Sequence, residues 1–326
     1  MERLNVGVLG CASIARRKML PALTACPLTR VAAVASRSGE RAGEFAAEFG
    51  TEPVTGYRAL LDRPDVDAVY VPLPAGLRAE WIVRALEAGK HVLAEKPLTT
   101  AAAPAREAVD LSRRRGLLLM ESFMFLHHSA HRRVRDLVES GRIGEPRSFS
   151  AEFTVPPLPA GDIRHRPELG GGALLDLGAY PVRAAQLFCG PGLEVAGAVL
   201  QYDPATGVDT AGSALLASPR LTAVLSFGME HHYRCRYGLT GSEGTITLDR
   251  AFTPPPDHRP VVRIERREGT EELLLPADDH FANIVDAFAR TALSGRGFAD
   301  HGDRILRQAD LLERIRRAAV TASPAG

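Results

Sequence analysis

The chain has 326 residues, which is enough for two domains that each bury a hydrophobic core. Hydrophobic residues make up 45% of it and charged residues 24%, and the net charge of +1 offers no basic surface for nucleic acid or a membrane. No apolar run approaches the roughly 20 residues of a membrane span, and the four cysteines lack metal-site spacing, so we expect free thiols in a reducing cytoplasm.

Short apolar runs alternate with helical patterns through residues 1–122. The runs are rich in valine and leucine, as expected for strands that are covered on both faces. This alternation predicts an α/β fold whose first domain is a doubly wound parallel sheet of the Rossmann type. The predicted strands are residues 4–9, 30–35, 68–72, 91–94 and 117–121, and the predicted helices are residues 13–25, 39–49, 76–88 and 101–115.

The first predicted strand ends in a dinucleotide-binding fingerprint. Gly10, Ala12 and Ala15 give the pattern G-x-A-x-x-A, in which alanine replaces the second and third glycines. Gly10 permits a tight turn, and the two small side chains let backbone approach a pyrophosphate and let the helix pack against the strand. A tight strand-to-helix turn in any α/β domain is the alternative explanation. We expect the phosphates at the helix N-terminus, against Gly10, Cys11, Ala12, Ser13 and Ile14.

The second predicted strand ends at Ser36 and Arg37. An NAD site usually carries an acidic residue here for the ribose 2′-hydroxyl, whereas a guanidinium suits a 2′-phosphate. Arg41 follows one helical turn later and adds to the same positive patch. These residues favour NADPH over NADH, and the alternative is that Arg37 is a solvated residue at a helix start.

Two further strand ends complete the predicted cofactor site. The strand at 68–72 runs into two prolines that form a rigid rim, where we expect the nicotinamide ribose. The strand at 91–94 runs into a glutamate and a lysine, at the edge where a doubly wound sheet binds its cofactor. The residues expected to line this part of the site are Leu73, Pro74, Leu77, Glu95 and Lys96.

Residues 123–326 form the predicted second domain. Many strands with few helices between them predict an α+β domain with a large, mostly antiparallel open sheet, which can keep one face free for a substrate or a second subunit. Whether the last helix packs back on the first domain stays open. The predicted strands are residues 147–155, 194–202, 211–216, 221–227, 233–239, 245–248, 261–265 and 271–275, and the predicted helices are residues 131–140, 278–293 and 303–320.

A glycine-rich stretch before an apolar helical pattern marks a second candidate for chemistry. Three glycines, residues 170–172, precede the pattern, so a helix begins near Gly172. Asp176 and Tyr180 are four residues apart and therefore share one face of that helix. A carboxylate and a phenol on an otherwise apolar helix indicate an active site, and a buried tyrosine satisfied by a nearby aspartate is the alternative.

The two signatures together resemble the Gfo/Idh/MocA oxidoreductase family, whose members include glucose-fructose oxidoreductase and inositol dehydrogenase. They are Glu95-Lys96-Pro97 after the fingerprint, and G-G-A-L-x-D-x-G-x-Y-P around Asp176 and Tyr180. The resemblance implies that Lys96 reaches substrate and nicotinamide, that the Lys96–Pro97 bond is often cis, and that Tyr180 faces the reactive oxygen across from the lysine. The sequence departs from the family at Arg78, where many relatives have histidine.

Shorter stretches resemble the actinobacterial sugar 3-ketoreductases. They are residues 10–17, 125–128, 161–164 and 241–246. The resemblance implies NADPH-dependent reduction of the C-3 ketone of a dTDP-linked 3-keto-6-deoxyhexose, in the biosynthesis of antibiotic sugars. Apart from the resemblance, we expect a cytoplasmic homodimer or homotetramer that associates through the open sheet.

The expected mechanism places two donors on the ketone oxygen. The Lys96 ammonium and the Tyr180 hydroxyl stabilise the charge that develops there, with Tyr180 as general acid and Asp176 orienting Lys96 or a sugar hydroxyl. We expect the nucleotide sugar to contact Arg164, His165 and Tyr233. No carboxylate lies at ligand spacing from His127-His128 or His231-His232, so no metal is expected.

Three other functions stay open at this stage. The first is an NADP-dependent dehydrogenase of a free sugar, inositol or trans-dihydrodiol, which would use the same fold and residues. The second is a non-catalytic NADP-sensing regulator, which would need neither Lys96 nor Tyr180. The third is reduction of biliverdin or an imine. The sequence leaves undecided which sugar is reduced and whether the new hydroxyl is axial or equatorial.

Overall fold

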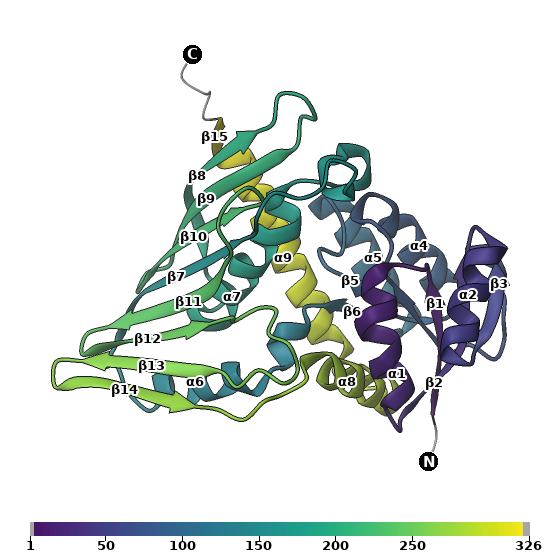
Figure 1. Ribbon diagram of the computed structural model, residues 1–326, viewed down its shortest axis with the longest axis horizontal. Helices are drawn as coiled ribbons and strands as arrows, with labels where there is room; N and C mark the ends of the chain where they lie inside the picture. The colour runs from purple at the N-terminus through teal and green to yellow at the C-terminus, as the bar shows by residue number, and fades with distance from the viewer. Residues whose placement is uncertain (1–2, 322–326) are drawn as a thin grey trace. The chain divides into compact units, whose positions relative to one another are not determined.

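A computed structural model describes residues 3–321 of the chain. It divides into two compact units, each assembled from two segments (Figure 1). The first unit contains Met1–Met124 and His280–Ala309, and the second contains Phe125–Asp279 and Asp310–Gly326. Among the described residues, no helix is both long and apolar enough to cross a membrane.

The first unit is built on a six-stranded parallel sheet, which confirms the predicted doubly wound fold. The strand order 3-2-1-4-5-6 reverses direction beside the first strand, the arrangement that binds dinucleotides at the carboxyl ends of the strands. In that order the strands are β3 (Glu52–Thr55), β2 (Thr29–Ser36), β1 (Leu4–Leu9), β4 (Ala68–Val71), β5 (His91–Glu95) and β6 (Leu119–Ser122).

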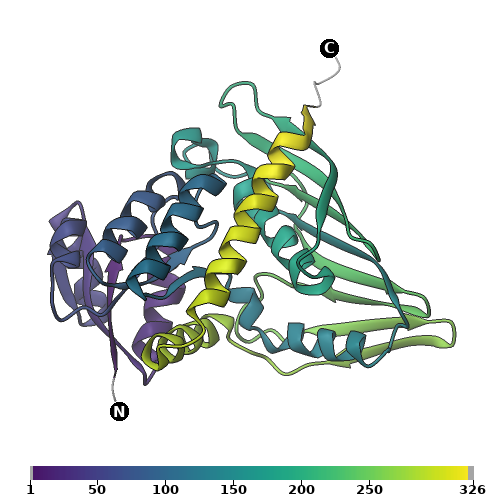
Figure 2. The same cartoon turned by 180° about the vertical axis from the view of Figure 1, so that it is seen from behind.

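Helices cover both faces of this sheet, with α1 and α8 on one side and α4 and α5 on the other (Figures 1 and 2). They isolate the central strands from solvent, and every residue of β4 is fully buried. This burial explains why the strands are continuous apolar runs. The helices are η1 (Ala15–Met19), α1 (Leu20–Ala25), α2 (Gly39–Phe49), α3 (Tyr57–Leu61), α4 (Ala75–Glu87), α5 (Ala102–Arg115), α8 (His280–Ser294) and the start of α9 (Phe298–Ala318).

One strand and one helix of this unit, β3 and α3, lie outside the predicted elements. Strand β3 has four residues, of which none is buried, and it lies at the edge of the sheet. A strand with this exposure has no apolar run by which to recognise it, and its Pro53 is a residue that sheets accept at their edges. The five-residue α3, which follows directly, is too short to show a helical period.

The second unit contains a nine-stranded sheet, which confirms the predicted open and mostly antiparallel architecture. Two pairs are parallel, β7 with β10 and β8 with β15. In sheet order the strands are β14 (Gly269–Leu274), β13 (Val261–Arg266), β12 (Gly244–Asp249), β11 (Arg234–Gly241), β7 (Pro146–Thr154), β10 (Thr222–Gly228), β9 (Asp209–Ala217), β8 (Glu194–Tyr202) and β15 (Ala319–Thr321).

Helices lie on one face of this sheet, as the view from behind shows (Figure 2). Phe149, Phe153 and Phe227 point to this inner face and are buried, while alternate residues such as Val224 point to the opposite, open face and are exposed. The chain end differs from the prediction, because α9 ends at Ala318 and residues 319–321 pair with β8. The other helical elements are η2 (Met124–His127), α6 (Ser129–Glu139), η3 (Ile163–His165), η4 (Pro167–Leu169), η5 (Leu174–Gly178) and α7 (Ala179–Cys189).

The helix that carries Asp176 and Tyr180 begins against a buried carboxylate. Asp209, at the start of β9, accepts a 2.5 Å hydrogen bond from the backbone N–H of Leu174. Gly172 has a φ of +109°, and a Cβ there would lie 2.3 Å from Asp209 Oδ1, so this approach requires glycine. Burial raises the pKa of Asp209 to about 6, although the hydrogen bond from Leu174 opposes that rise.

Asp209→Asn should flatten the dependence of stability on pH. In the unfolded chain an aspartate has a pKa of roughly 3.9, so between pH 4 and 6 the folded protein holds a proton that the unfolded chain has lost. The contribution of Asp209 to the free energy of unfolding therefore falls as the pH rises, by up to about 3 kcal/mol from pH 4 to 7. Urea unfolding across this range should show that the variant lacks this contribution, so its stability relative to the wild type rises with pH.

The exposed strand residue Asp249, changed to asparagine, is the matched control and should keep the wild-type dependence. Equal slopes for Asp209→Asn and the wild type would show that Asp209 ionises in the folded state much as it does in the unfolded chain.

Candidate active site

The fingerprint turn has the geometry that a dinucleotide requires. Gly10 has a φ of +125°, and a Cβ there would lie 2.9 Å from Cδ2 of Leu73, in the turn after β4. Glycine is therefore needed both for the backbone conformation and for the close approach of the two turns. The helix after Gly10 begins at Ser13 and widens into the π-helical η1 at residues 15–19, a feature that often accompanies functional sites.

The end of β2 is tied to this turn by a chain of hydrogen bonds. Ser36 is buried, and its hydroxyl accepts from the N–H of Ser38, which caps α2. Arg41 donates from Nη2 to the backbone oxygen of Cys11 at 2.7 Å, so its guanidinium bridges α2 and the fingerprint. Arg37 is exposed and lies close enough to the Tyr57 hydroxyl to oppose the rise in that group's pKa that burial causes. Two guanidinium groups thus lie near the end of β2, as the sequence predicts.

The turn after β5 carries Lys96, whose peptide bond to Pro97 is cis, in agreement with the family resemblance. The Lys96 side chain is half-buried. Glu95 accepts a 2.8 Å hydrogen bond from the Tyr70 hydroxyl, and the N–H of Leu98 donates to Glu121 at 2.7 Å. Carboxylates on both sides of Lys96 therefore anchor the turn.

The residues of this unit fit a nicotinamide dinucleotide. The glycine-dependent turn leads into a helix N-terminus at the switch point of the sheet, where backbone N–H groups and the helix dipole favour phosphate. On the rim, Leu73 is buried while Leu77 is 37% exposed. The positively charged end of β2 suits the additional phosphate of NADP.

In the second unit, Tyr180 lies in an aromatic cluster. It is only 4% exposed, and its ring centroid lies 5.1 Å from that of Phe153 and 5.8 Å from those of Phe125 and Phe252. The π-helical η5 directly precedes α7, the helix that carries Tyr180. A Cβ at Gly178, the last residue of η5, would lie 3.0 Å from the Phe227 ring. The ring is thus held between the helix and the inner face of the sheet.

Asp176 pairs with Arg164, a contact beyond those predicted from the sequence. Nε of Arg164 lies 2.5 Å from Oδ2 of Asp176, and its Nη1 lies 3.1 Å from Asp162. The two carboxylates raise the already high pKa of Arg164, so the guanidinium stays charged. The glycines between these residues allow the contact, because a Cβ at Gly171 would lie 2.5 Å from the Arg164 backbone oxygen. That glycine run was the available signal that the loop folds back on itself.

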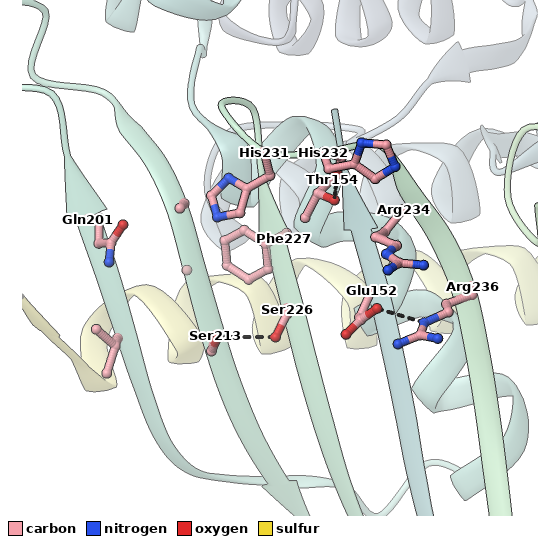
Figure 3. A pocket seen from close by; sticks show the side chains of 13 residues that line it. Glu152, Thr154, Gln201, Ser213, Ser226, Phe227, His231, His232, Arg234 and Arg236 are labelled. Atoms are coloured by element: carbon pink, nitrogen blue, oxygen red, sulfur yellow. Dashed lines mark hydrogen bonds and ion pairs between the residues drawn. The ribbon is translucent and has the colours of Figure 1, made fainter. Parts of the chain in front are cut away.

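The other expected substrate residues are His165 and Tyr233. His165 follows Arg164 and is half-buried. Tyr233 is half-buried before β11, and burial raises the pKa of its hydroxyl, which lies near Thr253 and Cys235. The next residue, Arg234, projects to the open face instead, where it lines a hollow with His231 and His232 (Figure 3).

The chain matches two family models that together cover most of its length. One describes an oxidoreductase family with an NAD-binding Rossmann fold and matches residues 4–123. The other describes the GFO/IDH/MocA C-terminal domain and matches residues 131–247.

Curated relatives are similar over nearly the whole chain. A dTDP-3,4-didehydro-2,6-dideoxy-α-D-glucose 3-reductase from Actinomadura kijaniata is 55% identical over 317 residues, which are 97% of this chain and 96% of that protein. An enzyme of the same name from Streptomyces violaceoruber is 54% identical over 329 residues, covering 98% of this chain and 96% of that one.

Solved structures include a 3-ketoreductase from Actinomadura kijaniata in complex with NADP and TDP-benzene. It has a TM-score of 0.96 and 55% identity, and the match covers 98% of this chain and 99% of that one. The same enzyme has been solved with a tyrosine changed to phenylalanine (54% identity, TM-score 0.96) and with a lysine changed to alanine (53%, TM-score 0.93), each over 98% of this chain and 99% of that one. On this evidence, the chain belongs to the Gfo/Idh/MocA family of oxidoreductases.

Proposed function

We propose that this protein is an NADPH-dependent ketoreductase that reduces the C-3 carbonyl of a dTDP-linked 3-keto-6-deoxyhexose, specifically dTDP-3,4-didehydro-2,6-dideoxy-α-D-glucose. The observation that carries the proposal is the 55% identity over 97% of the chain to an enzyme of that name. The chain also keeps both the lysine after β5 and the tyrosine after η5. A regulator that only sensed NADP would need neither residue.

NADPH supplies the hydride when bound. Gly10, Cys11, Ala12, Ser13 and Ile14 hold its pyrophosphate at the helix N-terminus, and Leu73, Pro74, Leu77 and Glu95 border its nicotinamide half. Arg37 binds the 2′-phosphate from the end of β2, where Ser36 adds a hydroxyl. Arg41 contributes positive charge there, while its bond to Cys11 oxygen keeps the β2 end and the fingerprint together.

Lys96 and Tyr180 supply the two donors for the ketone oxygen. Negative charge develops on that oxygen during reduction, and preorganised donors stabilise it more than they stabilise the neutral ketone. Tyr180 then delivers the proton. In support, the lysine and the tyrosine that were substituted in the Actinomadura kijaniata enzyme are separated by the same number of residues as Lys96 and Tyr180.

Arg164 and Asp176 act as a pair. The guanidinium fixes the position of the Asp176 side chain, so that it can accept a hydrogen bond from a substrate hydroxyl or from Lys96. Arg164, His165 and Tyr233 are the contacts of this unit to the nucleotide sugar.

Tyr180→Phe should lower kcat about 10²-fold to 10³-fold, because it removes one donor from the developing oxyanion while keeping the aromatic packing. The matched control is Tyr237→Phe, which removes a buried hydroxyl that lies 3.0 Å from Nδ1 of His131 in the same unit. The control should cost stability but leave kcat near that of the wild type. Steady-state rates of NADPH oxidation measure both, with cofactor affinity determined separately. A normal kcat for Tyr180→Phe would remove this residue from the proton-donor role.

The nucleotide should distinguish this function from a free-sugar dehydrogenase. We expect dTDP to raise the melting temperature of the NADP-bound protein, and UDP, xylose and glucose to raise it much less, because a ligand stabilises the state that it binds. NADP-dependent oxidation of xylose or glucose at rates comparable with reduction of the dTDP-sugar would contradict the proposal.

The open face of the nine-stranded sheet is proposed as the surface of a homodimer or homotetramer. Val199, Leu215 and Val224 lie together on it and are 42%, 44% and 51% exposed, and Leu215 and Val224 are paired directly across β9 and β10. Beside them is a polar hollow of about 440 Å³, in which Glu152 pairs with Arg236 at 2.7 Å (Figure 3). Because the surface carries apolar side chains and both signs of charge, a second copy can complement it.

Val224→Lys should shift the oligomer toward monomer, because it buries an unpaired ammonium at the proposed contact. Leu274→Lys is the control, since it adds the same charge at a 54% exposed position on β14 at the other end of the sheet. Sedimentation velocity at several protein concentrations measures the change. A wild type that stays monomeric at micromolar concentration, or a Val224→Lys oligomer as strong as that of the wild type, would contradict this surface.

A further inference from the structure

A buried arginine joins the two turns that lie at the nicotinamide end of the proposed cofactor site. Arg78, in the first turn of α4, is only 4% exposed. Its Nε and Nη2 donate to the backbone oxygen of Leu73 at 3.0 and 2.6 Å, and its Nη1 donates to the backbone oxygen of Pro97. Leu73 follows β4 and Pro97 follows β5, so one side chain bridges the carboxyl ends of two neighbouring strands.

The same pair of strands has a second buried cation at its other end. Lys90, which directly precedes β5, is 8% exposed. Its Nζ donates to the backbone oxygens of Arg63 and Val66, at 2.8 and 2.7 Å, in the segment before β4. Burial lowers the pKa of the Lys90 ammonium. Arg78 and Lys90 therefore fasten opposite ends of β4 and β5 by the same physical means, a buried positive charge that binds backbone carbonyls.

Arg78 and Lys90 differ in whether the turn that they bind contains a residue of the proposed active site. The turn that Lys90 holds bears no residue of the proposed site, whereas the turn held by Arg78 bears Lys96 immediately before Pro97. Glu121 already fixes that turn from the β6 side, through the N–H of Leu98. Arg78 fixes it from the β4 side, so the backbone around Lys96 is held from both neighbouring strands.

We propose that Arg78 is a positioning residue for catalysis: by binding the oxygens of Leu73 and Pro97 together, it fixes the backbone from which the Lys96 ammonium reaches the ketone oxygen. The inference rests on the proposed role of Lys96. A donor must be held within a fraction of an ångström of its productive position, and a displacement of about 1 Å costs on the order of 10² in rate. Arginine suits this task because its planar fork presents several donors at fixed angles, which neither lysine nor histidine can do.

The test compares Arg78→Met and Arg78→Lys with Lys90→Met, which removes the matched cation from the other end of the same strands. We expect all three variants to lower the melting temperature. Only the Arg78 variants should lower kcat, by about 10-fold to 10² for methionine and less for lysine, with KM for the dTDP-sugar changed by less than threefold. Lys90→Met should keep kcat within about twofold of the wild type.

Hydrogen exchange gives a readout that does not depend on turnover. In Arg78→Met, the amides of Lys96, Leu98 and Thr99 should exchange at least tenfold faster than in Lys90→Met, with or without NADP, because the turn has lost its contact with the β4 side. The conservative Arg78→Lys keeps the charge and serves if Arg78→Met does not fold. In that case, Arg78→Lys is compared with Lys90→Met, and we expect its kcat to be lower and its exchange faster than those of Lys90→Met.

Two results would overturn the proposal. One is a normal kcat in Arg78→Lys and Arg78→Met, whatever the exchange rates of the Lys96, Leu98 and Thr99 amides. The other is an equal loss of kcat in Lys90→Met, which would make Arg78 an ordinary structural contact. Lys96→Met separates this failure from failure of the proposed function. If Lys96→Met keeps full activity, the role of Lys96 is wrong, whereas slow Lys96→Met with normal Arg78 variants contradicts only the role of Arg78.

Discussion

Parallel pairing of β1, β4 and β5 is the constraint on which the first unit depends. It brings three turns that are far apart in the sequence to one edge of a sheet: the fingerprint at Gly10, the rim at Leu73 and the turn at Lys96. A Cβ at Gly10 would lie 2.9 Å from the Leu73 side chain, and Arg78 donates hydrogen bonds to the backbone oxygens of both Leu73 and Pro97. The three turns are therefore linked to one another by direct contacts.

The second unit reaches rigidity differently, by holding a helix against a sheet. Asp209 accepts a hydrogen bond from the N–H of Leu174 at the start of the helix, and Tyr180 packs in the aromatic cluster on the inner face of the sheet. Gly172 has a positive φ and a Cβ there would lie 2.3 Å from the Asp209 carboxyl oxygen, while a Cβ at Gly178 would lie 3.0 Å from the Phe227 ring. The glycines of the second signature thus have a packing explanation, apart from any role in binding. Chemistry and folding share the same short stretch of sequence, so substitutions here affect both.

Most of the architecture could be predicted because buried strands and amphipathic helices leave a periodic pattern. Among the elements that escaped, β3, α3 and β15 have four, five and three residues, which is too few to show a periodic pattern. The fingerprint, Lys96 and Tyr180 could be located from local motifs. The pairing of Arg164 with Asp176 and the contact of Asp209 with Leu174 could not be predicted. The first joins residues 12 positions apart and the second joins residues 35 positions apart, and both depend on tertiary packing alone.

The central claim is that this protein moves a hydride from NADPH to C-3 of a dTDP-linked sugar, and isotope transfer tests it most directly. Reduction with NADPH deuterated at C-4 on the transferred face should place one deuterium on C-3 of the dTDP-sugar product, which proton NMR and mass spectrometry detect. Deuterium at another carbon of the sugar, or none in the sugar while the cofactor is oxidised, would contradict the account.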